Sequence, residues 1–495
     1  MLIDPMPRQP LRRVARRIAD AALRAVDVRH AIRARVRRRG RRLTVCGRRY
    51  DLDRFDRVLL FGAGKAAAAM AREMERALGP RLTDGLVITK RGHALPLTRI
   101  AVREAGHPLP DDDGVRATEE LVKLAGGCTE RDLVFFLLSG GASALLTAPA
   151  GGLTWHDQQR TTDLLLACGA AIHDINAVRK HLSAVAGGRL ARLIGPATLI
   201  TLAVSDVIGD PIEVIGSGPT APDPTTYHDA LEVLARYRLE DDVPPAVLLH
   251  LRKGAGGLIE ETPKPDDPSV SRNPRQYELI ATNRLALRQA ATQATAMGFR
   301  PLVLTDRLQG EAKEAAGFVV AVGRSILEHQ QPIRPPACLL LGGETTVTLS
   351  SGDRTTATSG YGGRNQEFAL AGAHAMEGLD RLLLLSVATD GDDGIAPPGR
   401  PAAAGALADG ATIARGRSLG LDPARTLARH DAYGFFERLG DLLVTGPTRT
   451  NVMDLHLLLV EPHRQSPRHR RSAPAGLNLV RRAHHAEQSR STERG

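Results

Sequence analysis

The stretch ITLAVSDVIGDPIEVIGSGPTAPDP, residues 200–224, decides the fold that we expect for this chain. It opens with an apolar run at 200–204, short enough to be a buried strand, and then breaks into a long loop. The loop is dense in carboxylates, hydroxyls and glycines, and such loops are more often functional than idle. Ligands of open α/β sheets bind beyond the carboxyl ends of the strands. We therefore predict an α/β protein whose site includes Asp206, Asp210, Gly216 and Ser217.

The composition places the chain among globular proteins of more than one domain. It has 495 residues and 42% hydrophobic residues, which is too long for a single ordinary core. The sequence shows no apolar run of about 18 residues and no secretory h-region, so neither a membrane span nor a signal peptide is expected. Its four cysteines lie far apart without metal or disulfide spacing. This pattern fits a reducing compartment, and we predict a cytoplasmic protein.

The net charge of +11 is concentrated at the two ends of the chain. Residues 1–50 hold 16 basic and three acidic side chains, and residues 463–495 hold eight and two. The rest of the chain carries 42 basic and 50 acidic residues, so its body is mildly acidic. A nucleic-acid partner is therefore not expected. The basic tail 463–495 is predicted to be disordered.

Two more strand ends in the first half carry small-residue loops. In DRVLLFGAGKA, a strand leads through Gly62 and Gly64 into a helix, with Lys65 at its first turn. A cation there is unfavourable to the helix dipole, which indicates a functional role. The loop 139–143 follows another apolar run, and its small residues suit an anion. We select Ser139, Gly140, Gly141 and Ser143.

The same design recurs along the rest of the chain. His107, which precedes a proline in GHPLPDDDG, is held in extended geometry. The linker-like stretch 252–275 divides the chain into predicted domains at 11–252 and 276–460. Residues 8–39 predict helices, and 337–349 predict two strands around a glycine turn. The binding candidates in the second half are Asn283, Glu344, Asn365, Gln366, Asp390 and Gly391.

These strand ends predict two α/β domains that face each other across a cleft. Their chemistry suits phosphoryl transfer, in which glycine loops bind phosphates and cations neutralise the transferring group. We expect Lys65 and Arg364 to supply the cations. Asp206 and Asp390 are candidates for holding Mg²⁺, and Asp206 could also position the reacting hydroxyl.

At this level of detail the chain resembles the glycerate 2-kinase family whose C-terminal half is the MOFRL domain. The resemblance covers about residues 11–460 and rests on nine separated motifs in the family's order. The motifs are FGAGKA, GHPLPD, LLSGGASALL, NAVRKHLSAVAGGRLA, SDVIGDPIEVIGSGPTAPDPT, LLGGETTV, GGRNQEFAL, TDGDDG and VTGPTRTN.

The resemblance implies ATP-dependent phosphorylation of D-glycerate, normally to 2-phosphoglycerate, with a divalent metal. It implies an N-terminal Rossmann-like domain with a parallel sheet and a smaller C-terminal α/β domain, with Lys65 and Arg364 in the catalytic cleft. Two positions depart from the family pattern, Arg449 in place of a glycine and Asp392 in place of a threonine. The oligomeric state stays open, with a homodimer as one option.

One alternative is an NAD(P)-dependent hydroxypyruvate reductase. Gly62, Gly64 and Ala67 match a dinucleotide turn, G-x-G-x-x-A. However, Lys90 and Arg91 stand where a ribose-binding acid would end the next strand. The kinase reading is therefore favoured.

Overall fold

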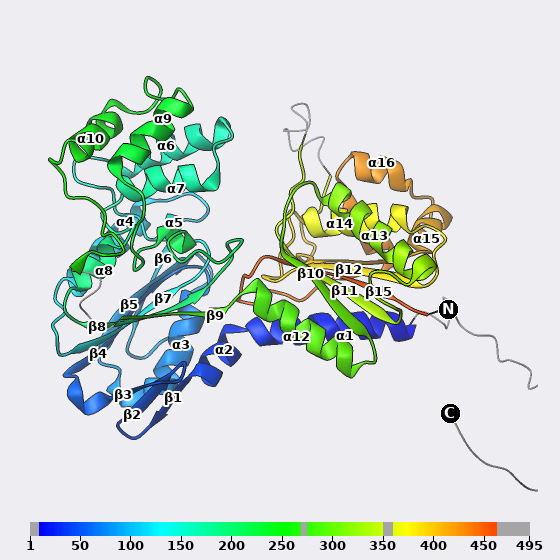
Figure 1. Ribbon diagram of the computed structural model, residues 1–495, viewed down its shortest axis with the longest axis horizontal. Coiled ribbons are helices and arrows are strands. Elements are labelled where there is room, and N and C mark those ends of the chain that lie inside the picture. The colour runs from blue at the N-terminus through cyan, green and yellow to red at the C-terminus, as the bar shows by residue number, and fades with distance from the viewer. Residues whose placement is uncertain (1–8, 269–274, 350–359, 463–495) are drawn as a thin grey trace, which may run out of the picture.

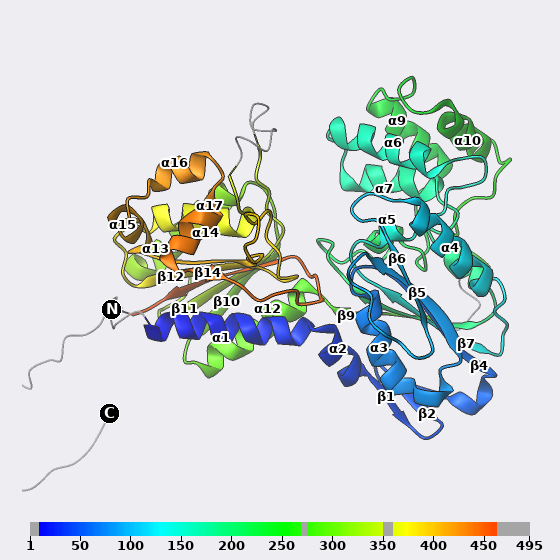
Figure 2. The ribbon, with the colours of Figure 1, turned by 180° about the vertical axis from the view of Figure 1, so that it is seen from behind.

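The computed structural model describes residues 9–268, 275–349 and 360–462. The basic tail 463–495, which we predict to be disordered, lies outside the described residues. Figures 1 and 2 show two α/β units side by side, each built on its own six-stranded sheet. None of the helices that the structure describes is long and apolar enough to cross a membrane.

The sheet of the first unit is parallel throughout and has the strand order β6-β5-β4-β7-β8-β9. Every residue of β7 and β8 is buried, as expected for strands covered by helices on both faces. This arrangement confirms the predicted Rossmann-like sheet. The strands are β4 (Arg57–Ala63), β5 (Asp84–Lys90), β6 (Ala101–Ala105), β7 (Asp132–Leu138), β8 (Thr198–Val204) and β9 (Arg275–Ala281).

Helices form layers around this sheet. One face packs against α2 and α3, and the other packs against α4, α5 and α8. Four further helices form a separate layer with its own apolar core, above the sheet in Figure 1. The helices are α2 (Val28–Arg35), α3 (Ala67–Leu78), α4 (Asp112–Ala125), α5 (Ala142–Leu145), α6 (Trp155–Ala167), α7 (Ile172–His181), α8 (Arg189–Ile194), α9 (Tyr227–Arg236) and α10 (Pro245–Ala255).

The sheet of the second unit is mixed, with the order β10-β11-β15-β12-β13-β14. Only β10 and β11 run parallel, and the other neighbouring pairs are antiparallel. The second strand expected within 337–349 is wrong, because the chain continues after β11 without a strand up to residue 349. The strands are β10 (Arg300–Leu308), β11 (Ala337–Gly343), β12 (Leu382–Ala388), β13 (Gly405–Asp409), β14 (Leu442–Leu443) and β15 (Asp454–Val460).

Helices also cover both faces of the second sheet. In Figures 1 and 2, α1 and α12 lie along one face, while α13, α14 and the short helices lie over the other. The helices are α1 (Gln9–Val26), α12 (Asn283–Ala296), α13 (Ala312–His329), α14 (Arg364–Ala375), α15 (Thr412–Ser418), α16 (Pro423–Ala428) and α17 (Ala432–Leu439).

The N-terminal segment connects the two units. The helical prediction for residues 8–39 holds for α1 and α2, but its last part is β1 (Val36–Arg39), in a small antiparallel sheet with β2 (Arg42–Val45) and β3 (Arg48–Asp51). The β-branched Val36 at the start of this strand favours extended backbone.

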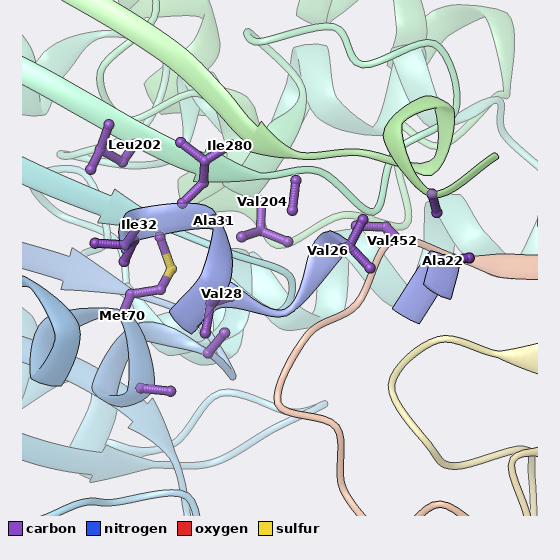
Figure 3. Packing of buried hydrophobic residues seen from close by; sticks show 14 of the residues in the cluster. Ala22, Val26, Val28, Ala31, Ile32, Met70, Leu202, Val204, Ile280 and Val452 are labelled. Carbon is purple, nitrogen blue, oxygen red and sulfur yellow. The ribbon is translucent and has the colours of Figure 1, made fainter. Parts of the chain in front are cut away.

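A continuous apolar core joins the units at the junction of α1 and α2. Figure 3 shows Val26 and Val28 beside Val204 of the first sheet, with Val452 of the second unit close by. All four are buried. The first helix therefore contributes to the second unit and β9, which starts at Arg275, contributes to the first sheet. The predicted boundaries at 252 and 276 stay a prediction.

Candidate active site

The glycine turn after β4 and the loop after β7 are bonded directly to each other. Lys65 N donates to Gly140 O at 2.9 Å, and Ala66 N donates to Ser139 Oγ at 3.0 Å. A Cβ on Gly64 would lie 2.2 Å from Ser139 Oγ, and Gly64 has φ of 131°. Only glycine permits this close approach. The glycine pattern is thus explained by packing between the two loops.

Gly62 is fixed by the same neighbouring strand, because a Cβ there would lie 2.7 Å from Leu137 O. The two glycines therefore shape the turn that presents Lys65. Whether they also touch a ligand stays a prediction.

Three predicted functional side chains gather around the next two glycines. A Cβ on Gly140 would lie 2.0 Å from Asp206 Oδ2. A Cβ on Gly141 would lie 2.9 Å from His107 Nε2 and 3.3 Å from Lys65 Cγ. Because residues 140 and 141 have no side chains, the Asp206 carboxylate, the His107 imidazole and the Lys65 side chain can all lie against this loop.

The charges around Asp206 shift its acidity strongly. The pKa of Asp206 is raised to about 6, chiefly by burial and also by the nearby Glu344 and Asp390 carboxylates, while Lys65 opposes the shift. Burial lowers the pKa of His107 to about 4, and Lys65 lowers it as well, so the imidazole is neutral at pH 7. A carboxylate with a pKa near the working pH is suited to proton transfer.

The site is completed by a cleft between the two units with a volume of about 310 Å³. Lys65, Ser139 and Gly140 line it from the first unit, and Asp390 and Gly391 line it from the second. The predicted cleft between two domains is therefore present. Lys90, His93, Asp392, Arg449 and Asn451 also line it.

Asn451 is a site residue that we did not select from the sequence. Its Nδ2 donates to Asp206 Oδ2 at 3.3 Å, which links the second unit to the first. The signal was its position at the end of the VTGPTRTN string. Nothing in local spacing showed that it would reach a carboxylate 245 positions away.

Arg364 begins α14 and is held by two carboxylates. Its Nε donates to Asp454 Oδ2 at 2.6 Å, and another guanidinium nitrogen lies 2.8 Å from Glu344 Oε1. Asp454 is fully buried and was not selected from the sequence. Burial raises the pKa of Asp454 and of Glu344, while Arg364 lowers both. Two acids therefore fix the guanidinium plane of Arg364 near the cleft.

The side-chain N–H groups of the two amides that follow Arg364 donate to buried carboxylates. Asn365 Nδ2 donates to Asp393 Oδ1 at 3.1 Å and to Asp454 Oδ1 at 2.9 Å. Gln366 Nε2 donates to the Asp393 carboxylate at 3.1 Å. Both amides are fully buried, and Asn365 supports Arg364 through their shared partner Asp454. Contact with a substrate stays a prediction.

Asn283, at the start of α12, holds the loop before β15 within the second unit and does not line the cleft. Its Nδ2 donates to Val452 O and to Asp454 O, both at 2.8 Å. Gly342 passes so close that a Cβ there would lie 1.7 Å from Asn283 Oδ1. The residue holds the strand that presents Asp454.

The remaining candidates lie at the borders of the site. Asp210 has φ of 57°, and burial raises its pKa, with Asp306 and Arg307 of the second unit nearby. Ser143 Oγ and Ser217 Oγ are 3.0 Å apart. Together with Gly216 they line a second cavity, outside the cleft.

Carboxylate and carbonyl oxygens are the donors that Mg²⁺ prefers, and Asp206 and Asp390 fit this chemistry. Within the described ranges, no three His, Cys, Asp or Glu side chains form a metal-binding group. Mg²⁺ in kinase sites is commonly held by one or two carboxylates together with substrate phosphates. The Asp390 carboxylate raises the pKa of Asp206, and both aspartates stay candidates.

Fold and site together define a two-unit α/β protein with a cleft between the units, lined by charged groups from both. Residues 14–252 match a domain of unknown function, DUF4147, and residues 337–454 match the MOFRL family. The chain is 39% identical to glycerate 2-kinase from Pyrococcus horikoshii, over 92% of this chain and 98% of that protein. This chain therefore belongs to the glycerate kinase family.

Two further comparisons bear on this placement. The crystal structure of glycerate kinase from Thermotoga maritima matches with a TM-score of 0.78 at 36% identity, over 91% of this chain and all of that one. A protein of Agrobacterium vitis with the provisional name hydroxypyruvate reductase is 40% identical, over 91% of this chain and 94% of its own length.

Proposed function

We propose that this chain transfers the terminal phosphoryl group of ATP to the 2-hydroxyl of D-glycerate in the interdomain cleft. The observation that carries the proposal is the convergence of Asp206 and Lys65 at the adjacent glycines Gly140 and Gly141, with Asn451 reaching the Asp206 carboxylate from the other unit. A cation, a base with a raised pKa and a second domain that completes the site are what phosphoryl transfer requires.

The proposed reaction assigns a step to each group. Asp206 accepts the proton of the substrate hydroxyl, and the oxygen of that hydroxyl forms a bond to the terminal phosphorus of ATP. The bond between that phosphorus and the bridging oxygen breaks, and ADP leaves with the electron pair. Lys65 stabilises the charge that is spread over the transferring group. Asn451 holds the orientation of the Asp206 carboxylate.

Mg²⁺, held by Asp206 or Asp390, would supply charge neutralisation for the ATP phosphates. Arg364 lies against Glu344 and Asp454, and we propose that its remaining N–H groups face the transferring group. Lys90 and Arg449 add positive charge to the cleft wall for anionic substrates. A cytoplasmic location is part of the proposal, and all four cysteines are free.

The reductase alternative is not favoured by the site. The glycines of the dinucleotide-like turn are explained by close packing on Leu137 and Ser139. Lys90, at the end of β5, lines the cleft where a ribose-binding acid would be needed.

The test is turnover by the purified protein. We expect ADP to form only when ATP, Mg²⁺ and D-glycerate are all present, with 2-phosphoglycerate identified as the product by NMR. A parallel assay follows NAD(P)H oxidation by hydroxypyruvate. Oxidation there, without glycerate-dependent ADP, would overturn the kinase proposal. Formation of 3-phosphoglycerate would overturn only the choice of hydroxyl.

A further inference from the structure

A second cavity lies within the first unit, against α6 and α7. It has a volume of about 270 Å³. Its other walls come from residues 108–110, from Ser143 of α5 with Leu146 and Thr147 after it, from the segment after α7 and from residues 216–217. Ser143 lines this cavity, while Ser139 and Gly140 of the same loop line the interdomain cleft. An elongated ligand that follows this loop would therefore reach from the cavity to Lys65.

Arg179 lies on α7 and lines this cavity. Among the residues that the structure describes, no carboxylate forms an ion pair with it. Its one hydrogen bond runs from a terminal nitrogen to Ser143 O, at a long 3.4 Å. Burial lowers the pKa of Arg179, with no acid to offset the lost hydration. A partly buried cation without an ion-pair partner is unfavourable unless an anion binds there.

The neighbouring Lys180, on the same helix, is a cation whose charge is balanced within the protein. Lys180 is buried, and its Nζ lies 3.1 Å from the buried Asp223 carboxylate. Its charge is compensated inside the protein. Arg179 differs because its partner must come from outside, through the cavity that it lines.

The walls of the cavity suit a planar aromatic group. Leu109 and Leu166 line it and are 57% and 59% exposed, which is unusual for leucine. Apolar walls of this kind stabilise a base by burial and stacking. Glycerate is small and carries an oxygen on every carbon, so it has no apolar surface to bury against these leucines.

Polar groups at the cavity wall match the remaining parts of a nucleotide. Gln159 offers both an amide donor and an acceptor for the base edge, and Asp163 offers a carboxylate for ribose hydroxyls. The cavity thus presents an apolar wall, an amide, an acid and a free cation.

We propose that this cavity is the nucleotide subsite, with the base between Leu109 and Leu166 and a phosphate paired with Arg179. The triphosphate then follows the 139–143 loop toward Lys65 and Gly140. This inference rests on the proposed function, and it places the base in the first unit rather than in the cleft.

The first test is Arg179→Gln, which removes the charge and keeps a polar side chain. We expect KM for ATP to rise about tenfold or more, since a charge-assisted bond to phosphate is lost. KM for D-glycerate and kcat at saturating ATP should change less than twofold. Arg160→Gln, on the exposed side of α6, is the matched control and should leave all three values unchanged.

The second test is direct binding of a fluorescent ADP analogue, without glycerate, to wild type, Arg179→Gln and Leu166→Ala. Both variants should bind it more weakly, and Leu166 is exposed enough for its truncation to leave folding intact. A rise in KM for glycerate alone would assign the cavity to the acid substrate. Unchanged nucleotide affinity in both variants would also overturn the proposal. Because binding needs no turnover, failure of the proposed kinase reaction would be seen separately.

Discussion

At the scale of single residues, Asp206 carries the chemistry that we propose. Asp206→Asn keeps the shape of the side chain and removes its charge. We expect kcat to fall about a hundredfold or more, since general base catalysis of this kind contributes factors of that size. The measurement is steady-state ADP formation at saturating substrates. Asp210→Asn, in the same loop, serves as the control and should retain more activity. A near-normal kcat for Asp206→Asn would show that this aspartate is not the general base and has a structural role only.

The acidity of Asp206 gives a separate prediction for wild type. The carboxylate must be ionised to accept a proton, and its pKa is raised to about 6. Activity should therefore be low below pH 6 and rise as the pH increases through that value. The measurement is kcat/KM for D-glycerate between pH 5 and 8 at fixed Mg²⁺. A flat profile over this range would exclude Asp206 as the titrating base.

Arg449 stands in a backbone conformation that favours glycine, with φ of 63°, and it lines the cleft. A non-glycine residue there costs about 1 kcal/mol. Arg449→Gly should relieve that strain, so the free energy of unfolding should not fall, whereas KM for at least one anionic substrate should rise severalfold. Arg449→Lys keeps the charge and should keep KM. Unchanged KM values for both substrates in Arg449→Gly would show that this cation has no role in binding.

At the scale of elements, the packing of α14 on β12 and β15 places a histidine in a fully buried position. His456 stacks on Phe368, with ring centroids 4.1 Å apart, and its Nδ1 lies 2.8 Å from Ser386 Oγ. The Ser386 hydroxyl donates to Asn365 Oδ1, so Nδ1–H must donate to Ser386. Nε2 has no partner. Protonation would therefore place an unpaired charge in the core.

This arrangement predicts how stability depends on pH. Burial lowers the pKa of His456 from 6.5 to about 3, and Arg364 lowers it as well. Below pH 6.5 His456 is protonated in the unfolded chain, whereas in the folded chain it stays neutral down to about pH 3. The free energy of unfolding therefore falls as the pH falls. Between pH 7 and 5, wild type should lose about 2 kcal/mol more than His456→Phe, measured by urea unfolding. Equal losses in the two proteins would contradict a neutral buried imidazole.

The strands and their polar ends could be predicted from the sequence, because short and fully apolar runs such as 133–138 and 200–204 are buried on both faces. Such runs are typical of parallel strands covered by helices. The loops were found because glycines and acids follow those runs directly. Partner choice could not be predicted, since the acid that binds Arg364 lies 90 positions away. Asn365 and Gln366 are examples: the sequence shows that each has an amide that could bind a ligand, but it does not show that both amides donate to Asp393.

At the scale of the whole molecule, α1 fastens the N-terminus to the second unit. Arg12 forms ion pairs with Asp409, at 2.8 Å, and with Asp441. The two carboxylates are only 5% and 2% exposed. Arg12→Met would leave them without this cation, and we expect the free energy of unfolding to fall by about 3 kcal/mol.

The control for this prediction is Arg13→Met, on the exposed side of the same helix. It should change stability by less than about 0.5 kcal/mol. Chemical unfolding followed by circular dichroism measures both variants. If Arg12→Met were as stable as Arg13→Met, the ion pairs would not hold α1 to the second sheet.

Catalysis in such a molecule depends on cations from both units acting together. Lys65 belongs to the first unit and Arg364 to the second, and both influence the charge on Asp390 in the cleft. If both stabilise one transferring phosphoryl group, removal of either should lower kcat more than it raises KM. Their losses should also not add, because each cation is effective only when the other holds the same group.

The measurement is a double-mutant cycle of Lys65→Ala and Arg364→Ala at saturating ATP. We expect the double variant to lose clearly less activation free energy than the sum of the two single losses. Because Arg364→Ala leaves the buried Asp454 unpaired, Arg364→Lys is included to keep a cation beside it. Additive losses would mean that the two cations act on separate groups. A nearly silent Arg364→Ala, with full loss in Lys65→Ala, would limit Arg364 to fixing Glu344 and Asp454, and the transferring charge would then be stabilised from the first unit alone.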